Sequence, residues 1–263
     1  MTAPVALVTG GAVGIGRAIA IAVGERGGLL FNIDPDEEQN LETGRLVERA
    51  GGRCVSFAEN AGDAQAVKRI FAEITGEVDR LDLLANNAAI WNDTSLTAGD
   101  YDSQTQAFER ALQSCTTAAF CCTMAAVPLL EQSSNANVIN LNTEHMDVDR
   151  ALTHIAAASG YDCAKFSLSR LTKSWARELA PKNIRVNELC FGAVDTPMLR
   201  AVNQQIAEAG MKAEDIAAAV FHIVDQGPEG ITGAACSFGY SGSSRQESLS
   251  QIAALAHLAA SKD

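Results

Sequence analysis

The chain has 263 residues and a formal net charge of −12 at pH 7, with 32 acidic and 20 basic side chains. This balance argues against a nucleic-acid-binding protein, which needs a basic face. The length suits one α/β domain with a sizeable core, and the apolar runs predict no membrane span.

The N-terminal segment predicts a strand, a glycine turn and a helix. Residues 5–8 form a short apolar run with β-branched side chains, typical of a buried parallel strand. TGGAVGIG follows, with Gly10, Gly14 and Gly16 at the spacing TGxxxGxG. Glycine lets the backbone approach a ligand closely, and the N-terminus of the next helix offers N–H groups to a pyrophosphate. A tight strand-to-helix connection would also use glycine, so the turn alone does not establish a dinucleotide site.

Asp34 follows the second expected strand, Leu29–Ile33. A carboxylate here can accept hydrogen bonds from the ribose hydroxyls of NAD and would repel the 2′-phosphate of NADP. A solvated acidic helix start explains Asp36 and Glu37 well, but Asp34 less well. Arg17, in the helix after the glycine turn, is a candidate phosphate partner. NAD is therefore the expected cofactor, with NADP as the alternative.

Strand-like and helical runs alternate along the rest of the chain. Such alternation predicts a parallel sheet covered by helices on both faces. Right-handed crossovers then give a Rossmann-like, doubly wound α/β domain, with the ligand crevice at the carboxyl ends of the strands. The further strands are expected at 54–57, 81–85, 137–141, 184–189 and 234–238, and the helices at 37–50, 64–75, 104–130 and 157–179.

The seven cysteines show no CxxC and no Cys/His metal spacing. Most of them lie in apolar stretches, as expected for small buried thiols in a reducing compartment. The first residues already form the first expected strand, so we expect no signal peptide. The prediction is a cytoplasmic protein that binds neither a metal, nor nucleic acid, nor a membrane.

Tyr161 and Lys165 stand four residues apart in YDCAK and should share one face of a helix. A nearby ammonium favours the phenolate, so the pKa of Tyr161 is predicted to fall below its usual value of about 10. That would make the phenol a general acid/base near neutral pH. The alternative is an amphipathic helix with a surface lysine and a half-buried tyrosine.

Together these motifs resemble the classical short-chain dehydrogenase/reductase family, over residues 5–238. TGGAVGIG, NNAA at 86–89, YDCAK, and IRVNELCFGAVDTPM at 184–198 stand in the order of that family. The resemblance implies hydride transfer between a secondary alcohol, or its carbonyl form, and a nicotinamide cofactor. It also implies a homodimer or homotetramer formed through the long helices.

The resemblance also implies roles for individual residues. Tyr161 would be the acid/base, and Lys165 would lower its pKa and bind the nicotinamide ribose. Thr143 takes the position of the family serine, with Asn142 as a neighbouring alternative donor. The cofactor would contact Gly10, Gly14, Ile15, Gly16, Asp34, Asn60 near the adenine, Asn87, Ala88, Tyr161, Lys165, and Val194 and Thr196 beside the carboxamide.

Cys115 falls where the family has a catalytic asparagine, with Ser114 beside it. A cysteine cannot offer the geometry of an amide. The alternative function is therefore a weakly catalytic or non-catalytic dinucleotide-binding protein.

The segment 143–161 is longer than the family pattern and contains His145 and His154. With Trp91 and Phe191, these are the expected substrate residues, and they suggest a sugar, a polyol or a cyclic alcohol. A solvated polar loop is the alternative for this segment. The expected domain covers 1–241 and includes a substrate lid at 193–212, and a helical tail follows at 242–263.

Overall fold

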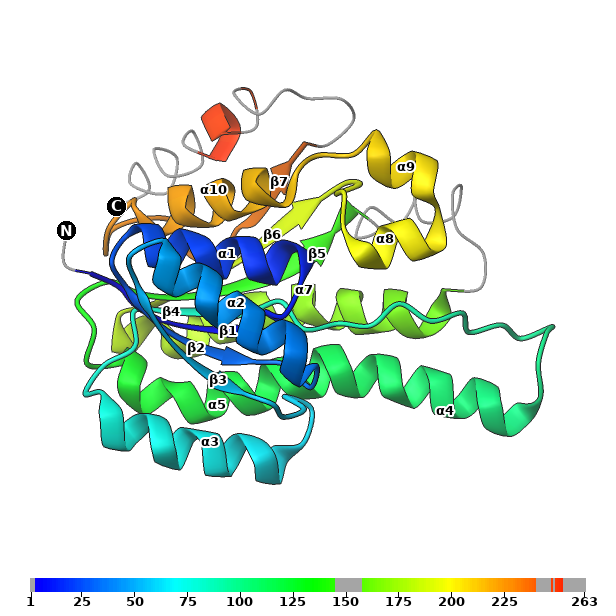
Figure 1. Ribbon diagram of the computed structural model, residues 1–263, viewed down its shortest axis with the longest axis horizontal. Coiled ribbons are helices and arrows are strands. Elements are labelled where there is room, and N and C mark those ends of the chain that lie inside the picture. The colour runs from blue at the N-terminus through cyan, green and yellow to red at the C-terminus, as the bar shows by residue number, and fades with distance from the viewer. Residues whose placement is uncertain (1–2, 145–157, 240–246, 248, 253–263) are drawn as a thin grey trace.

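The computed structural model describes residues 3–144, 158–239, 247 and 249–252 (Figure 1). Within them, seven strands form one parallel sheet in the order β3-β2-β1-β4-β5-β6-β7. The strands are β1 Val5–Thr9, β2 Leu29–Ile33, β3 Arg53–Phe57, β4 Leu83–Asn86, β5 Ala136–Thr143, β6 Ile184–Phe191 and β7 Ala235–Phe238. The predicted doubly wound α/β fold is confirmed.

Helices cover both faces of the sheet (Figure 1). The two helices α1 and α10 pack on one face, and α2 packs beside α1. On the opposite face lie α3, α5 and α7, and α4 extends from that layer alongside α7. Their bounds are α1 Gly14–Glu25, α2 Glu37–Arg49, α3 Ala64–Glu77, α4 Tyr101–Leu112, α5 Ala118–Leu130, α7 Ser159–Leu179, α8 Pro197–Val202, α9 Gln204–Glu208 and α10 Ala213–Val224.

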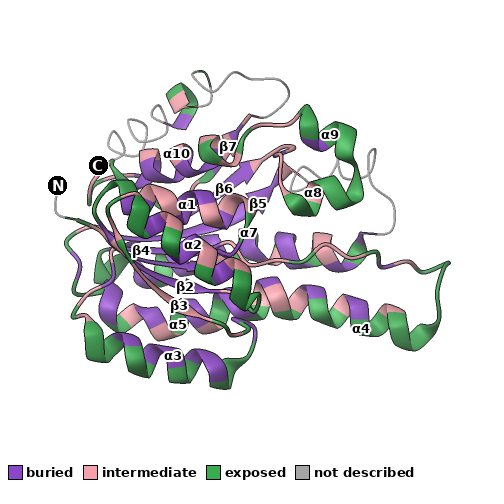
Figure 2. Cartoon of the chain, in the orientation of Figure 1, coloured by how far each residue is buried: buried purple, intermediate pink, exposed green. Residues whose placement is uncertain are grey.

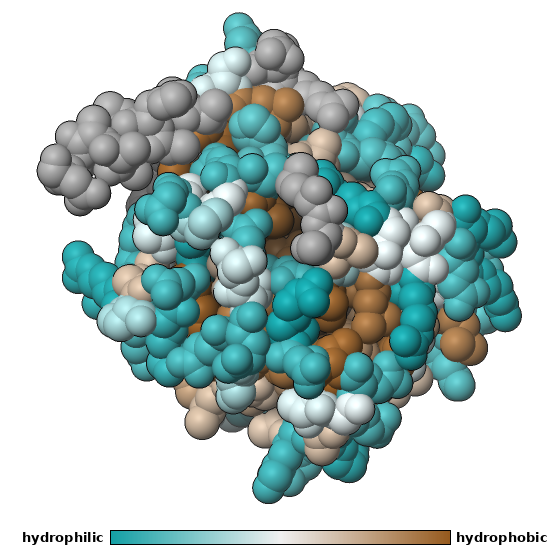
Figure 3. Space-filling model, turned by 90° about the vertical axis from the view of Figure 1, so that its left-hand side faces the viewer, coloured by the Kyte–Doolittle hydropathy of each residue, from teal (hydrophilic) through white to brown (hydrophobic). Residues whose placement is uncertain are grey.

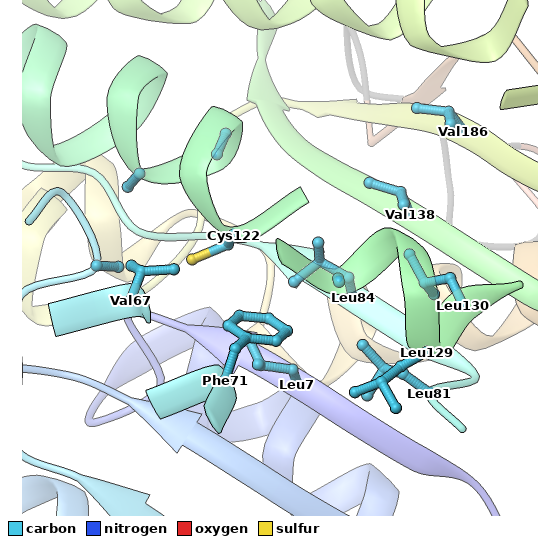
Figure 4. Packing of buried hydrophobic residues seen from close by; sticks show 14 of the residues in the cluster. Leu7, Val67, Phe71, Leu81, Leu84, Cys122, Leu129, Leu130, Val138 and Val186 are labelled. Atoms are coloured by element: carbon cyan, nitrogen blue, oxygen red, sulfur yellow. The ribbon is translucent and has the colours of Figure 1, made fainter. Parts of the chain in front are cut away.

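Alternating strand residues supply two separate hydrophobic cores. Leu7 and Leu84 point to the layer of α3 and α5, where they meet Phe71 (Figure 4). Their neighbours Val8 and Leu83 belong to the other core, with α1 and α10. Figure 2 shows the consequence: the central strands β1, β4, β5 and β6 are buried along nearly their whole length, whereas α2, α3 and α4 are exposed along their solvent side.

The long helix expected at 104–130 is interrupted. The structure has α4, then a π-helical turn at Gln113–Thr117, then α5, which contains Pro128. A π-helical turn widens the helix by one residue and recurs at functional sites. Among the described residues, the run Tyr101–Leu130 is long and apolar enough to cross a membrane by length and composition alone. Its second half packs on α3 and on strands β4 and β5, which accounts for that apolar character as a core helix.

The strand order indicates at which edge of the sheet a ligand site is expected. The chain moves outward from β1 to β3 and then returns to place β4 on the other side of β1, so the order reverses between β1 and β4. In such sheets the ligand crevice lies at the carboxyl ends of the strands beside that reversal. The molecule's other end, where the strands begin, has a mainly hydrophilic surface with apolar residues showing in places (Figure 3).

Only part of the C-terminal tail is described. Residues 247 and 249–252 are helical, and Ile252 is fully buried in the core formed by α1 and α10. This part of the tail therefore packs on its own domain.

Candidate functional site

The glycine turn joins β1 to α1 at the carboxyl edge of the sheet. Gly10 donates its N–H to Ile33 O at 2.8 Å, and its φ of +68° favours glycine. Gly14 has a φ of +57°. A Cβ on Gly16 would lie 2.2 Å from Gly10 O, so only glycine lets the helix start this close to the turn.

The NNAA segment holds this turn in place by hydrogen bonds. Thr9 Oγ1 accepts the N–H groups of Asn87 and Ala88, both at 3.1 Å. The Asn87 amide donates back to the carbonyls of Thr9 and Gly10, at 3.1 and 2.8 Å. Asn86 points elsewhere, because its amide donates to Thr123 Oγ1 and Asn140 Oδ1 inside the protein. The segment thus holds the glycine turn in shape, and Thr9 is a supporting residue that the sequence reasoning did not single out.

The first turn of α1 suits a pyrophosphate. Its N-cap, Val13, provides no side-chain hydrogen bond to the helix. The amides of the first turn therefore keep the partial positive charge of a helix N-terminus for an anionic ligand. Thr196, the N-cap of α8, lies against the same place, since a Cβ on Gly14 would come within 3.2 Å of its methyl group.

Asp34 lies beside the glycine turn, as its proposed contact with ribose requires. Its Oδ2 accepts the N–H of Ala12 at 3.1 Å and its Oδ1 accepts that of Asp36 at 3.0 Å. Asp36 instead caps α2 through Gln39, which fits the acidic helix start. Arg17 is turned towards α2, where it donates to Gln39 and to Thr43 Oγ1.

The remaining predicted cofactor residues lie on loops beyond the strands. Asn60 is exposed after β3, and its side chain accepts the N–H of Gly62. Val194 is buried in the loop after β6 and forms an isolated parallel bridge with Met211. Asp195 N–H donates to Met211 O, and Asp195 binds Arg200 and Lys212 through its carboxylate. The two ends of the predicted lid are therefore joined at a neck.

The predicted catalytic side chains meet at the end of β5. Tyr161 and Lys165 lie on α7, and Tyr161 shares a side-chain hydrogen bond with Thr143, the last residue of β5. Lys165 is 4% exposed, and its Nζ donates to Leu141 O at 2.8 Å. That Nζ lies 5.7 Å from the centroid of the Tyr161 ring.

The predicted fall in the pKa of Tyr161 is wrong in this structure. Although the residue is only half-buried overall, desolvation raises the pKa of its phenol above the usual value, and the Cys115 thiol and the Asp162 carboxylate raise it further. The hydrogen bond with Thr143 acts in the opposite direction. The ammonium of Lys165 donates instead to the carbonyl of Leu141.

Two of the predicted substrate residues adjoin this centre. The Trp91 ring packs against Tyr161, with centroids 4.8 Å apart and planes tilted by 52°. Phe191 ends β6 directly opposite Thr143 in the strand register and is half-buried. His145 and His154 lie outside the described residues.

The π-helical turn gives Ser114 and Cys115 different surroundings. Ser114 Oγ accepts the N–H of Ile90 and donates to Ala111 O, so it bonds to the helix and to the loop after β4. Cys115 is buried, and burial raises the pKa of its thiol while the charge of Lys165 lowers it.

A doubly wound parallel sheet with a glycine turn at its carboxyl edge defines a dinucleotide-binding protein of the Rossmann type. The model of the short chain dehydrogenase family matches residues 4–207. The chain therefore belongs to the short-chain dehydrogenase/reductase family of oxidoreductases.

Three relatives illustrate the range of similarity. A 3beta-hydroxysteroid dehydrogenase from Mediterraneibacter gnavus is 30% identical over 215 residues, covering 80% of this chain and 74% of that protein. A putative short-chain dehydrogenase/reductase structure from Burkholderia xenovorans is 27% identical, with a TM-score of 0.79 over 92% of this chain and 98% of that one. A short chain dehydrogenase from Mycobacterium paratuberculosis bound to NAD is 22% identical, with a TM-score of 0.77 over 93% and 98% of the two chains, a likeness of fold.

Proposed function

We propose that this protein is an NAD-dependent oxidoreductase that transfers a hydride between a secondary alcohol and nicotinamide. The observation that carries the proposal is the meeting of Tyr161, Thr143 and Lys165 at the end of β5, on the same edge of the sheet as the glycine turn. A hydroxyl pair beside a buried cation can bind a substrate oxygen and exchange its proton.

The chain's own residues would handle the proton and the substrate oxygen. Thr143 donates a hydrogen bond to that oxygen, and Tyr161 removes the hydroxyl proton in oxidation or returns it in reduction. Lys165 supplies positive charge behind the phenol. Bound NAD supplies the hydride chemistry at its nicotinamide ring. Acid/base help of this kind contributes roughly 10²–10⁴-fold to the rate.

The raised pKa of Tyr161 gives this reaction a pH dependence. A phenol that keeps its proton at neutral pH serves directly as the acid for carbonyl reduction. Alcohol oxidation needs the phenolate, so its rate is expected to rise from neutral to alkaline pH. The reductive rate is expected to fall over the same range.

NAD, rather than NADP, is the proposed cofactor. Asp34 places a carboxylate beside the turn, where the 2′-phosphate of NADP would be repelled, and Arg17 is engaged with α2. The structure from Mycobacterium paratuberculosis is described as bound to NAD. In an Asp34→Ala variant, the preference for NAD over NADP is expected to shrink, and an unchanged preference would remove Asp34 from this proposal.

A cyclic secondary alcohol is the proposed substrate class. The flat faces of Trp91 and Phe191 adjoin Tyr161 and Thr143, and they suit the apolar side of a ring. One relative is named as a 3beta-hydroxysteroid dehydrogenase, whose substrates carry the hydroxyl on a ring. Sugars and polyols are the alternative substrate classes, and the activity scan described below includes them.

The second candidate is a dinucleotide-binding protein with little catalysis. It is favoured by Cys115, a buried thiol where the family pattern has asparagine, and by the raised pKa of Tyr161. This candidate retains the glycine turn and NAD binding but predicts no alcohol-dependent NADH formation.

The test is a scan of NAD and NADP reduction at 340 nm against cyclic alcohols, sugars and polyols. Tyr161→Phe should lower turnover at least 100-fold while leaving NAD affinity, measured by calorimetry, within about twofold. Tyr101→Phe is the matched control, since Tyr101 is 81% exposed on α4. If Tyr161→Phe keeps the wild-type rate, Tyr161 is not the acid/base. If the wild type binds NAD but reduces it with no alcohol, the second candidate stands.

A homodimer or homotetramer in the cytoplasm is also proposed. Phe120 and Met124 on α5 and Phe166 on α7 are exposed apolar side chains on the long helices. Light scattering after gel filtration would measure the assembly, and Met124→Glu should shift it towards monomer. All seven cysteines are free thiols, which suits a reducing compartment.

A further inference from the structure

A buried carboxylate is linked by hydrogen bonds to the neighbours of the proposed catalytic residues. Glu188, in the middle of β6, is 2% exposed. Its Oε2 accepts hydrogen bonds from Asn142 Nδ2 and Ser169 Oγ, both at 2.6 Å. Burying a carboxylate is costly unless hydrogen bonds and nearby cations offset the loss of water. A carboxylate kept at such a position therefore calls for an explanation beyond packing.

Asn142 connects this carboxylate to Thr143 and Lys165. Its Nδ2 also donates to Lys165 O at 3.3 Å, and its Oδ1 accepts the N–H of Thr143 at 2.9 Å. Nδ2 also lies 3.2 Å from Ser169 Oγ, so three acceptors surround the nitrogen and one donor meets the oxygen, which fixes which way the amide points. Without the carboxylate, the amide loses its shortest bond and the backbone of Thr143 loses its fixed partner.

Glu188 also bonds to the helix that carries the catalytic pair. Lys165 and Ser169 stand four residues apart on α7, and Ser169 donates to the carboxylate. The carboxylate therefore has hydrogen bonds both to β5, through Asn142, and to α7, through Ser169.

Several groups act on the phenol of Tyr161. Cys115, from the π-helical turn, and Asp162, on α7, raise its pKa, whereas the hydrogen bond with Thr143 lowers it. Of these groups, Thr143 is the one that Glu188 reaches through Asn142.

We propose that Glu188 is a positioning residue of this site, which holds Thr143 in place through Asn142. The catalytic part of this inference rests on the proposed function.

Glu188→Gln separates charge from geometry. The new amide oxygen can still accept from Asn142 and Ser169, while the negative charge is gone. The hydrogen bonds that fix Asn142 are therefore kept, so kcat should stay within about threefold of the wild type. Glu178→Gln, at an exposed residue of α7, removes the same charge elsewhere and should leave kcat unchanged.

Glu188→Leu removes the acceptor as well as the charge. We expect kcat to fall at least 10-fold while the affinity for NAD stays within about threefold, because the glycine turn is not involved. Ser169→Ala, which removes one donor, is the milder variant if Glu188→Leu does not fold. It should lower kcat about twofold to fivefold.

An activity-independent readout separates this inference from the proposed function. The chain has three tyrosines, so ionisation of Tyr161 can be followed at 295 nm as the difference between each protein and its Tyr161→Phe counterpart. In Glu188→Leu the phenol should ionise at higher pH than in the wild type, because the hydrogen bond with Thr143 that lowers the pKa of Tyr161 is weakened. If this shift is seen in a protein that oxidises no alcohol, it supports the inference and refutes the proposed oxidoreductase. An unchanged ionisation curve, or wild-type kcat in Glu188→Leu, would overturn the inference.

Discussion

Thr9→Val tests how the glycine turn is held, and its cost follows from three contacts. Thr9 is 1% exposed at the end of β1. Its Oγ1 accepts the N–H groups of Asn87 and Ala88 at 3.1 Å and donates to Ala85 O at 3.5 Å, a long contact. Valine keeps the shape and the methyl group but leaves both N–H groups without their acceptor.

The expected loss of stability is about 2–4 kcal/mol. Each unsatisfied N–H costs about 1–3 kcal/mol, so two of them cost about 2–6 kcal/mol. The lower part of this range applies, because both N–H groups are only partly buried. For a chain of this size, the loss corresponds to roughly 5–15 °C in Tm. The same change should weaken NAD binding, because Asn87 also holds the carbonyls of Thr9 and Gly10.

Thr9→Ser is the matched control, because it keeps the acceptor and loses one methyl group, which is worth about 1 kcal/mol. Urea unfolding followed by circular dichroism would give both free energies of unfolding, and calorimetry would give both NAD affinities. If Thr9→Val proves as stable as Thr9→Ser and binds NAD equally well, the hydroxyl does not hold the turn as described here.

Three other outcomes follow from the described contacts. Gly16→Ala should abolish NAD binding, because the added Cβ would collide with the carbonyl oxygen of Gly10 and distort the turn. Gly76→Ala is the contrasting change, at an exposed helical site with open space around it, and it should raise the unfolding free energy by about 0.5–1 kcal/mol. Calorimetry and urea unfolding would measure the two effects. At pH 8, exposed Cys163 should react with a thiol reagent well before Cys122, because burial raises the pKa of Cys122 to about 12; a fast phase that survives Cys163→Ser would contradict this. The pKa of Asp195 is depressed by its two cationic partners, so the ion pairs stabilise the neck above the unfolded pKa of about 3.9 and are lost as pH falls through the folded value. Proteolysis of the predicted lid should be faster for Asp195→Asn at pH 7 than for the wild type, and equal rates would show that the carboxylate does not hold the neck.

The strands and the helices α1, α2, α3 and α7 were predictable from their apolar patterns, whereas α10, at Ala213–Val224, was not among the expected helices. The ends of β5 and β6 were not predictable, since Asn142, Thr143 and Phe191 continue these strands past the apolar run. The break between α4 and α5 carries no local signal, because a π-helical turn depends on packing rather than on Gly or Pro at that point.

Site residues were predictable where backbone geometry demands one residue type, as in the glycine turn. The pKa of Tyr161 was not, because a four-residue spacing gives the face of a helix but not the burial of the phenol or the carbonyl that holds Lys165. The only sign of Glu188 in the sequence is that an acidic residue stands inside the apolar run IRVNELCF. Its partners Asn142 and Ser169 lie far from it in the sequence, so only the folded chain shows what it does.

The neck formed by Val194, Asp195 and Met211 has a consequence for how a ligand would be enclosed. With both ends of the segment 193–212 fastened together, we propose that α8 and α9 move as one unit when a ligand binds. Little chain would then have to be ordered on closure, so less of a ligand's affinity would be lost to conformational entropy.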